Sequence, residues 1–262
     1  MADYYEKDGK RLARCTKIIS DCTDKSAPLT QWAANMVVGW IEENCEFTDI
    51  ITKDGFEHQS VYVVTDDHLD SARKNFREVS QAALDVGSEV HAAIEKYLLL
   101  KMQEETPENW EFPFGSEQGL RAFDAFLKWQ REHELKPIAL EQTVYGNGWA
   151  GTCDYVGWFA GKLYVIDWKS SAGYYPEMRY QVAAYRNAAD ISSHFTATVF
   201  KASDFTEIPE IEGCGILRLD KTTGLPEWHD TSKSYEQDLK VFNRMVDLYF
   251  ERHPRIKKKA GL

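Results

Sequence analysis

The sequence predicts an α/β fold in which a central mixed β-sheet is flanked by helices and preceded by a helical N-terminal region. Residues 151–171 contain two strand-like apolar runs around a turn at Ala160-Gly161, which is the pattern of a β-hairpin. Residues 213–230 repeat this pattern around a Thr-Thr-Gly turn, and apolar residues recur at helical spacing before and after the hairpin. With 262 residues and 43% hydrophobic content, the chain is long enough to bury one sizeable core.

The first half of the chain is expected to be mainly helical. Thr30 can cap a helix that carries Trp32 on an apolar stripe. A second helix is predicted by four apolar residues at helical spacing, Val86, Val90, Ile94 and Leu98. A third helix is predicted for residues 116–134, after a loop that contains Pro107 and Pro113.

The second half is expected to alternate strands with helices. The run IALEQTVY at residues 138–145 predicts a strand just before the hairpin. Pro176, at a first helical position, begins a helix that extends to about Ala189. The strands within residues 213–230 extend the sheet, and a last helix is expected from Tyr235 to Arg252.

These elements predict three regions along the chain. Residues 1–75 are expected to form a mostly helical region packed on the core, residues 76–252 the core itself, and residues 253–262 a basic C-terminal tail. No apolar run approaches the roughly 20 residues needed to cross a bilayer, and the first residues lack the apolar stretch of a secretory signal. We therefore expect a cytoplasmic protein without a membrane partner.

The hairpin is expected to bring two carboxylates together. If Ala160-Gly161 forms the two-residue turn, Phe159 faces Lys162, and counting outward places Asp154 opposite Asp167. Directly opposed residues have Cβ atoms roughly 5 Å apart, so two ionised carboxylates would repel by about 3 kcal/mol at an effective dielectric near 20. A hard divalent cation such as Mg²⁺ or Mn²⁺ offsets this repulsion and commonly binds substrate phosphate oxygens as well.

Other registers and a structural interpretation stay open for the same residues. A three-residue loop would place Asp154 opposite Trp168, whereas a turn at Gly161-Lys162 would place it opposite Lys169. Lys169 lies two positions beyond Asp167 and therefore points to the same face. The alternative to a functional site is a salt-bridged surface hairpin, but the second strand is apolar on both faces, and a buried Asp-x-Lys needs pairing or ligation.

Four short sequence blocks resemble motifs of the PD-(D/E)XK nuclease superfamily, and within it the RecB-like exonucleases, particularly the free-standing phage type. The blocks are Gly87–His91 (GSEVH), Gly151–Asp154 (GTCD), Ile166–Lys169 (IDWK) and Gln181–Tyr185 (QVAAY), and they occur in the expected order. The resemblance covers residues 87–185 and implies a restriction-endonuclease-like core. It says less about the rest of the chain.

The resemblance also implies a set of metal ligands. Asp154 and Asp167 would hold Mg²⁺, for which Mn²⁺ can substitute, together with His91 and the backbone carbonyl of Trp168. Glu141 could assist a second metal, although an exposed strand glutamate is an equal alternative. His91 borders an apolar helical stripe, where a lone histidine is more often an ordinary core residue.

Three further residues are expected to be catalytic by the same resemblance. Lys169 would position or deprotonate the attacking water and stabilise the transition state. Gln181 would orient that lysine or a substrate phosphate, and Tyr185 would support the same side of the site. Their four-residue spacing puts Gln181 and Tyr185 on one helical face, although a core tyrosine beside a solvated glutamine would look the same.

The formal charge of −11 argues against a nucleic-acid substrate, because phosphate binding draws most of its affinity from Lys and Arg. Local distribution matters more than the sum, since the screening length is about 8 Å at physiological salt. Two basic clusters could track a DNA backbone or could be solvated tails; they comprise Lys7, Lys10, Arg11, Arg14 and Lys17 near the start, and Arg252, Arg255, Lys257, Lys258 and Lys259 near the end. Arg179 and Arg218 are further candidates for DNA contacts, although an edge-strand arginine is the safer interpretation of Arg218.

The function that these patterns favour is a Mg²⁺-dependent DNA exonuclease that uses water as its nucleophile. The resemblance implies a phage-type recombination or replication role in a bacterial host cytoplasm, beside a single-strand-annealing recombinase. A structure-specific or restriction-type endonuclease and a catalytically silent DNA-binding module are the alternatives. Five scattered cysteines without a C-x-x-C pair predict neither disulfides nor structural zinc, and they depart from the spacing that holds an iron–sulfur cluster in some relatives.

Overall fold

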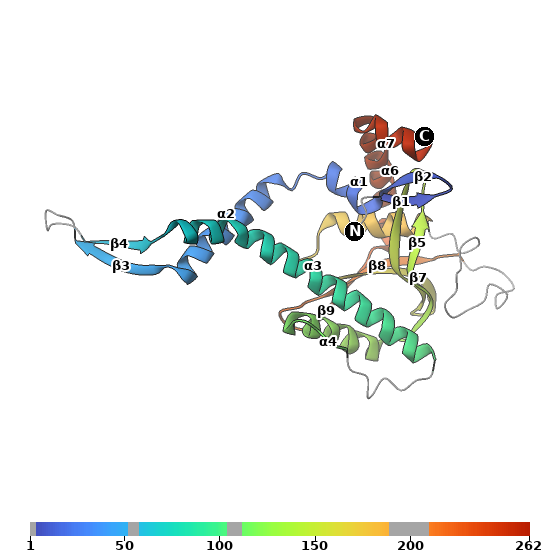
Figure 1. Cartoon of the computed structure of the whole chain (residues 1–262). Coiled ribbons are helices and arrows are strands. Elements are labelled where there is room, and N and C mark those ends of the chain that lie inside the picture. Colours follow the sequence, from blue (N-terminus) through green and yellow to red (C-terminus); the bar gives the residue numbers. More distant parts are fainter. Residues whose placement is uncertain (1–3, 52–57, 104–111, 189–209) are drawn as a thin grey trace. The chain divides into compact units, whose positions relative to one another are not determined.

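The computed structural model describes residues 4–51, 58–103, 112–188 and 210–262. The chain divides into two compact units, of which unit 1 comprises residues 1–23 and 86–262 and unit 2 comprises residues 24–85. Helix α3 (Asp66–Met102) contributes its first part to unit 2 and its last part to unit 1. The two units are therefore described separately (Figure 1).

Unit 1 is built on a mixed seven-stranded sheet. Its strands are β1 (Tyr4–Lys7), β2 (Lys10–Arg14), β5 (Leu135–Tyr145), β6 (Trp149–Phe159), β7 (Lys162–Lys169), β8 (Gly213–Leu219) and β9 (Pro226–Asp230). The strand order is β1-β2-β6-β7-β8-β9, with β5 paired along β6. The β2–β6 and β7–β8 pairs are parallel and the other pairs are antiparallel, so the prediction of a mixed sheet in an α/β fold is confirmed.

Helices cover this sheet on both faces. They are α1 (Cys15–Cys22), the last part of α3, α4 (Glu117–Glu132), α5 (Pro176–Ala188), α6 (Tyr235–Arg252) and α7 (Pro254–Ala260). One apolar cluster joins α1, α5 and α6 to β7 through Leu163 and Val165. A second cluster joins α3 and α4 to the same strand through Ile166 and Trp168. Strand β7 is therefore buried on both faces, which agrees with its uninterrupted apolar sequence.

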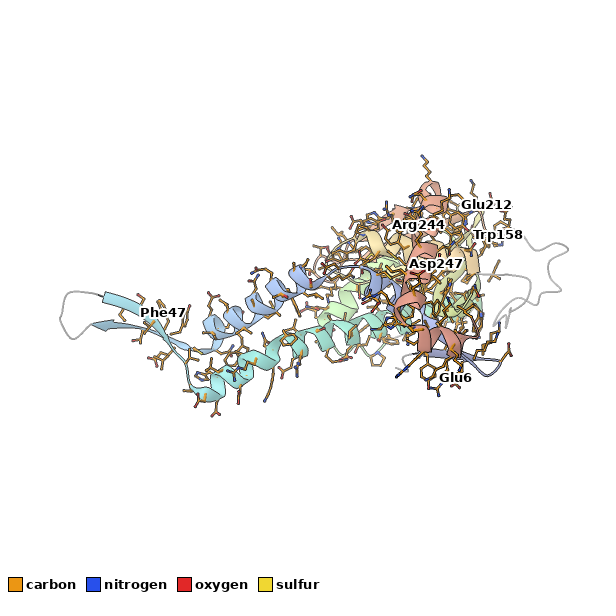
Figure 2. The ribbon with its side chains drawn as sticks, turned by 90° about the horizontal axis from the view of Figure 1, so that it is seen from above. Glu6, Phe47, Trp158, Glu212, Arg244 and Asp247 are labelled. Carbon is orange, nitrogen blue, oxygen red and sulfur yellow. The ribbon has the colours of Figure 1, made fainter. Side chains whose placement is uncertain are left out.

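Unit 2 contains helix α2 (Ser26–Asn44), a two-stranded antiparallel sheet of β3 (Glu46–Ile51) and β4 (His58–Val63), and the first part of α3. Asn75 of α3 donates a hydrogen bond to the Met36 carbonyl of α2, and the Trp32 and Phe76 rings meet edge to face. None of the α2 residues is fully buried. Large apolar side chains such as Phe47 are exposed (Figure 2).

The N-terminal prediction differs from the structure. The first strands belong to the central sheet, and residues 24–85 form a separate unit that includes a β-hairpin. The missed signal is the Asp8-Gly9 pair, whose φ angles of 51° and 73° suit a tight hairpin turn between β1 and β2. Helix α2 begins at Ser26, before the predicted cap Thr30, where the Asp24 carboxylate accepts hydrogen bonds from the Ser26 backbone and hydroxyl.

The predicted basic tail at residues 253–262 is a helix in the structure. Ala260 of α7 is buried and Ile256, four residues earlier, packs against the same core, so this short segment is amphipathic. Ala189 and Pro107, which were assigned to a helix end and to a loop, lie outside the described residues. Within the described ranges, no helix combines the length and the apolar character needed to span a bilayer.

Candidate metal centre

The turn between β6 and β7 sets the register of the site. Ala160 and Gly161 have φ angles of 51° and 77°, as a two-residue hairpin turn requires, and Phe159 pairs with Lys162. The two-residue turn is therefore confirmed. The alternatives of a three-residue loop and of a turn at Gly161-Lys162 are wrong for this hairpin.

The two strands separate just beyond the last regular pair, Tyr155 with Ile166. The next residues are Asp154 and Asp167, which the register places opposite each other. Instead of continuing the ladder, Asp154 Oδ2 accepts a hydrogen bond of 2.7 Å from the Trp168 backbone N–H. At the point where β7 separates from β6, the Asp154 carboxylate thus binds the Trp168 N–H in place of a backbone carbonyl.

Toward the start of β6, its neighbour on this side is β2 instead of β7. Trp149 and Ala150 of β6 pair there with Ala13 and Arg14 of β2. Asp154 therefore lies between two successive partners of β6, at a fork in the sheet. Side chains at such a fork can approach one another without disrupting a continuous ladder. This position explains how the sheet accommodates several buried polar groups.

The Asp167 side of the fork contains the predicted catalytic residues. Asp167 is 1% exposed, and its Oδ2 lies 2.5 Å from Lys169 Nζ. Its Oδ1 accepts a hydrogen bond of 3.2 Å from Gln181, whose amide also donates to the Tyr185 hydroxyl. Gly151 makes room for Tyr185, because a Cβ at this glycine would lie 2.5 Å from the tyrosine ring. The structure therefore brings Lys169, Gln181 and Tyr185 together around one carboxylate.

The Asp154 side contains the predicted histidine. His91 Nδ1 lies 3.4 Å from Asp154 Oδ1 and 3.6 Å from Glu141 Oε1. Its Nε2 donates a 3.1 Å hydrogen bond to the Trp168 carbonyl. Helix α3 thus presents His91 to the fork rather than to the apolar interior.

Glu141 is the residue whose role the sequence left most open. Its neighbours Leu140 and Gln142 pair with Tyr155 and Cys153, so the register places Glu141 opposite Asp154. Its φ of 47° is in the left-handed region, which is uncommon for a residue with a side chain and costs on the order of 1–3 kcal/mol. A strained residue beside a polar cluster indicates a functional constraint, and the glutamate carboxylate faces His91.

The electrostatics of the two sides differ. Burial alone would lower the pKa of His91, but the carboxylates of Asp154 and Glu141 outweigh it and raise that pKa to about 10. Burial favours a raised pKa for Asp154, but His91 and Lys169 outweigh it and lower the pKa of this carboxyl. Burial, together with the Asp154 charge, raises the pKa of Asp167 to about 6 despite the nearby Lys169. Burial opposes the charge of Lys169, yet the two aspartates raise its pKa.

The donor atoms fit a hard divalent cation. One ligand atom from each of His91, Glu141 and Asp154 lies within 4.8 Å of the others. Asp167 Oδ2 is buried and has an ion pair but no well-aligned hydrogen bond. The carboxylate oxygens suit Mg²⁺ or Mn²⁺. Asp167 does not belong to this group of three, and its Oδ2 lies 2.5 Å from Lys169 Nζ. The Trp168 carbonyl accepts a hydrogen bond from Nε2 of the same histidine.

Cys15 is a neighbour of the centre that the motif analysis did not identify. It is the first residue of α1 and is fully buried. Burial raises the pKa of its thiol, and the Asp167 charge raises it further. Its signal in the sequence is weak, because a single buried cysteine usually behaves as a small apolar residue.

Arg218 does not lie free beside the centre. Its Nε lies 2.5 Å from Glu227, and one terminal nitrogen lies 3.2 Å from Asp220 and donates to the Ser171 carbonyl. Strand β8 is paired on both sides, by β7 and β9, so Arg218 is not on an edge strand as the alternative interpretation held. This guanidinium links β9 and the loop after β7.

The remaining residues that were assigned to DNA contacts lie on helices. Arg179 of α5 is partly exposed and is 3.7 Å from Asp238 of α6. Lys257 and Lys258 are exposed on α7. The structure thus brings the acidic residues, Lys169, His91, Gln181 and Tyr185 together, and it places these three basic residues elsewhere.

A comparison of the chain with models of protein families found no match, and a comparison with curated proteins found none either. The clearest feature is an asymmetric pair of aspartates, one beside an imidazole and the other beside an ammonium group.

Proposed function

We propose that this protein is a metal-dependent deoxyribonuclease with a PD-(D/E)XK-type core that removes nucleotides from DNA ends. The observation that carries the proposal is the pair Asp154 and Asp167 at the β6–β7 fork, with Lys169 2.5 Å from Asp167 and His91 3.4 Å from Asp154. Buried carboxylates of this kind need a cationic partner. Converging oxygen ligands beside a fixed lysine suit phosphodiester hydrolysis.

The metal would be held by Asp154, Asp167, His91 and the Trp168 carbonyl, with Glu141 contributing from β5. When bound, a Mg²⁺ or Mn²⁺ ion would polarise a phosphoryl oxygen and increase the acidity of a nearby water. The Trp168 N–H holds Asp154 Oδ2, which leaves Oδ1 on the side of His91. The backbone therefore orients one ligand oxygen before any substrate arrives.

Lys169 is proposed to stabilise negative charge that develops on the phosphate. Its raised pKa keeps the ammonium protonated at neutral pH, so in the metal-free protein it can donate a hydrogen bond but cannot accept a proton. Of the two roles expected from the sequence, the raised pKa favours positioning and electrostatic stabilisation. Its side chain is 22% exposed, so a substrate oxygen can reach it.

Gln181 and Tyr185 are proposed to hold Asp167 rather than to react. The Gln181 amide donates to Asp167 Oδ1 and to the Tyr185 hydroxyl, which leaves Asp167 Oδ2 on the side of Lys169. This hydrogen bonding restricts the carboxylate to one orientation. Such preorganisation lowers the reorganisation that the reaction would otherwise require.

The preference for an exonuclease rests on the His91 and Gln181–Tyr185 blocks, which restriction-type endonucleases need not carry. A phage-type recombination or replication role, beside a single-strand-annealing recombinase, extends the proposal by analogy. A silent DNA-binding module would be expected to lack the lysine or an aspartate. In this chain all three positions are filled.

The direct test compares linear DNA with covalently closed circular DNA of the same sequence in the presence of Mg²⁺. We expect nucleotides to be released from the linear form, with loss of activity on chelation and recovery with Mg²⁺ or Mn²⁺. Cutting of the closed circle would favour the endonuclease. The absence of hydrolysis with either metal, on either form, would refute the nuclease proposal.

A further inference from the structure

Two basic segments from opposite ends of the chain lie together in unit 1. Helix α7 packs beside the β1–β2 hairpin, and Figure 1 shows the two elements at one end of the unit. The Lys10 side chain packs against Gly261. A Cβ added to this glycine would lie 2.9 Å from Lys10 Cε. We call this surface the basic face, and its cations are Lys7, Lys10, Arg14, Arg255, Lys257, Lys258 and Lys259, because Arg11 projects from the other side of the hairpin.

The basic face has a charge opposite to that of the whole chain. Its two segments, residues 4–14 and 254–260, contain these seven cations and Arg11, and two acidic residues, Glu6 and Asp8. The chain as a whole carries −11. Because salt screens charges over about 8 Å, an anionic ligand at this surface responds to the local excess and not to the total.

Several contacts hold the hairpin cations in place. Lys7 Nζ lies 4.0 Å from the centre of the Tyr145 ring, and the Arg11 guanidinium lies 4.3 Å from the centre of the Tyr4 ring. Arg11 also makes an exposed ion pair of 3.4 Å with Glu6, which Figure 2 labels. The ring contact positions Lys7 at the surface.

The surface between the hairpin and α7 is hollowed. A depression of about 330 Å³ lies between β1, β2, the β5–β6 turn and the end of α7. Lys7 and Lys10 line it together with Asp8 and the backbone of Gly146 and Gly148. The lysines of α7 are exposed beside it, so a chain of phosphates could pass from the hollow across the helix.

The basic face is connected to the metal centre through the sheet. Strand β2 pairs with β6 at Ala150, and Asp154 follows four residues later, about 13 Å along the strand. This is roughly four base steps of a duplex, in which one strand carries a phosphate every 3.4 Å or so. Arg14, the last residue of β2, pairs with Ala150 of β6, the strand that carries Asp154.

We propose that the basic face binds the sugar–phosphate backbone of DNA several nucleotides away from the bond at the metal centre. This inference rests on the proposed function, because the continuity from the face to the centre favours a long nucleic acid over a membrane surface. Lysine and arginine contacts of this kind are independent of sequence and depend strongly on salt. The face would hold the uncleaved part of the DNA while its end occupies the centre.

The test measures binding of a fluorescently labelled duplex by anisotropy in EDTA, so that cleavage does not contribute. The triple substitution Lys257→Ala, Lys258→Ala and Lys259→Ala should weaken binding about tenfold or more and reduce the slope of log Kd against log salt by about two to three. Arginine at the same three positions should restore both. Alanine is a good helix former, and circular dichroism would show whether α7 and the fold are retained.

A matched triple variant replaces three exposed lysines elsewhere in unit 1, Lys162, Lys233 and Lys240. It should bind the duplex like the wild type. Equal losses in both triple variants, or no loss in the α7 variant, would overturn the inference, even if the wild type digests linear DNA. Stronger binding to phosphatidylserine vesicles than to the duplex, lost in the α7 variant, would also overturn it and assign the face to a membrane surface.

Failure of the proposed function gives a different pattern. A wild-type protein that binds the duplex through the basic face but hydrolyses no DNA would refute the nuclease and retain the binding surface. A wild type that hydrolyses DNA with full affinity after loss of the three lysines would retain the nuclease and refute the surface. The Lys10→Ala variant, which lies on the hairpin and not on α7, provides an independent second measurement and should also weaken binding.

Discussion

The two aspartates of the fork occupy neighbouring strands but have opposite surroundings. Asp154 accepts a hydrogen bond from the Trp168 N–H and lies beside His91, and its pKa is lowered. Asp167 is more deeply buried, and burial together with the Asp154 charge raises its pKa to about 6 although Lys169 is adjacent. The same side chain thus has two electrostatic characters, depending on what surrounds it.

This difference indicates a division of roles. The Asp154 side groups the imidazole and two carboxylates that can hold a cation, whereas the Asp167 side positions an ammonium group. Neither side alone would combine metal binding with a fixed lysine. Substitutions on one side can therefore be compared with substitutions on the other.

The largest effect is expected on the Asp167 side. Asp167→Ala and Lys169→Ala should each lower the rate of DNA hydrolysis by about 10³-fold or more. Asp167 is the proposed metal ligand that also positions Lys169, and Lys169 is proposed to stabilise charge at the reacting phosphate. Single-turnover rates on linear DNA would measure this loss. Lys162→Ala, an exposed lysine on the same strand, should keep the wild-type rate, and near-normal rates in both site variants would show that the assignment of the site is wrong.

On the Asp154 side, the expected effect is on metal affinity. His91→Ala and Glu141→Gln should each weaken Mg²⁺ binding by about 10- to 100-fold, since each removes a donor or charge from the group that converges on Asp154. Titration calorimetry without DNA would measure the affinity. Glu132→Gln, an exposed helical glutamate, serves as the control, and unchanged affinity in both site variants would mean that these residues form only an ion-pair cluster.

The pH dependence of metal binding tests the imidazole separately. Because the pKa of His91 is about 10, it is protonated at pH 7, and binding a cation to its nitrogen should release about one proton. The metal-bound form then carries fewer protons, so affinity should rise with pH. Calorimetry in buffers of different ionisation enthalpy would count the protons, and a count near zero for the wild type would exclude His91 as a ligand.

The smallest effect is expected from the packing that supports Asp167. Gly151→Ala would place a Cβ 2.5 Å from the Tyr185 ring, which should displace the ring and destabilise the fold by about 1–3 kcal/mol. Tyr185→Phe removes only the hydroxyl that accepts from Gln181 and should cost about 0.5–1.5 kcal/mol. Thermal unfolding would compare them, and a larger loss for Tyr185→Phe would contradict the steric explanation.

Local sequence patterns were sufficient for the elements that carry the site. The turn at Ala160-Gly161 follows from glycine and the flanking alternation, and the register of two strands follows from that turn. The shared face of Gln181 and Tyr185 follows from helical spacing alone, and both side chains are joined by one hydrogen bond. In each case the relevant residues are close in sequence.

Long-range packing decided what the patterns left open or missed. The sequence did not distinguish Glu141 from an ordinary exposed strand residue. In the structure its backbone is left-handed and its carboxylate lies beside His91. The sequence allowed Arg218 to contact a phosphate. In the structure it forms an ion pair with Glu227 of β9. The two ends of the chain looked like separate charged segments until the sheet and α7 brought them together.

The amino-acid sequence by itself determined the α/β class, the β6–β7 hairpin and the shared face of Asp167 and Lys169, because these depend on periodicity, whereas the structure chose the register that places Asp154 opposite Asp167. Only the tertiary structure decided that the strands part at Asp154, that His91 and Glu141 meet there, and that the basic face exists. The reason is physical. Spacing along a chain sets which way neighbouring side chains point, whereas contacts across hundreds of residues depend on how whole elements pack.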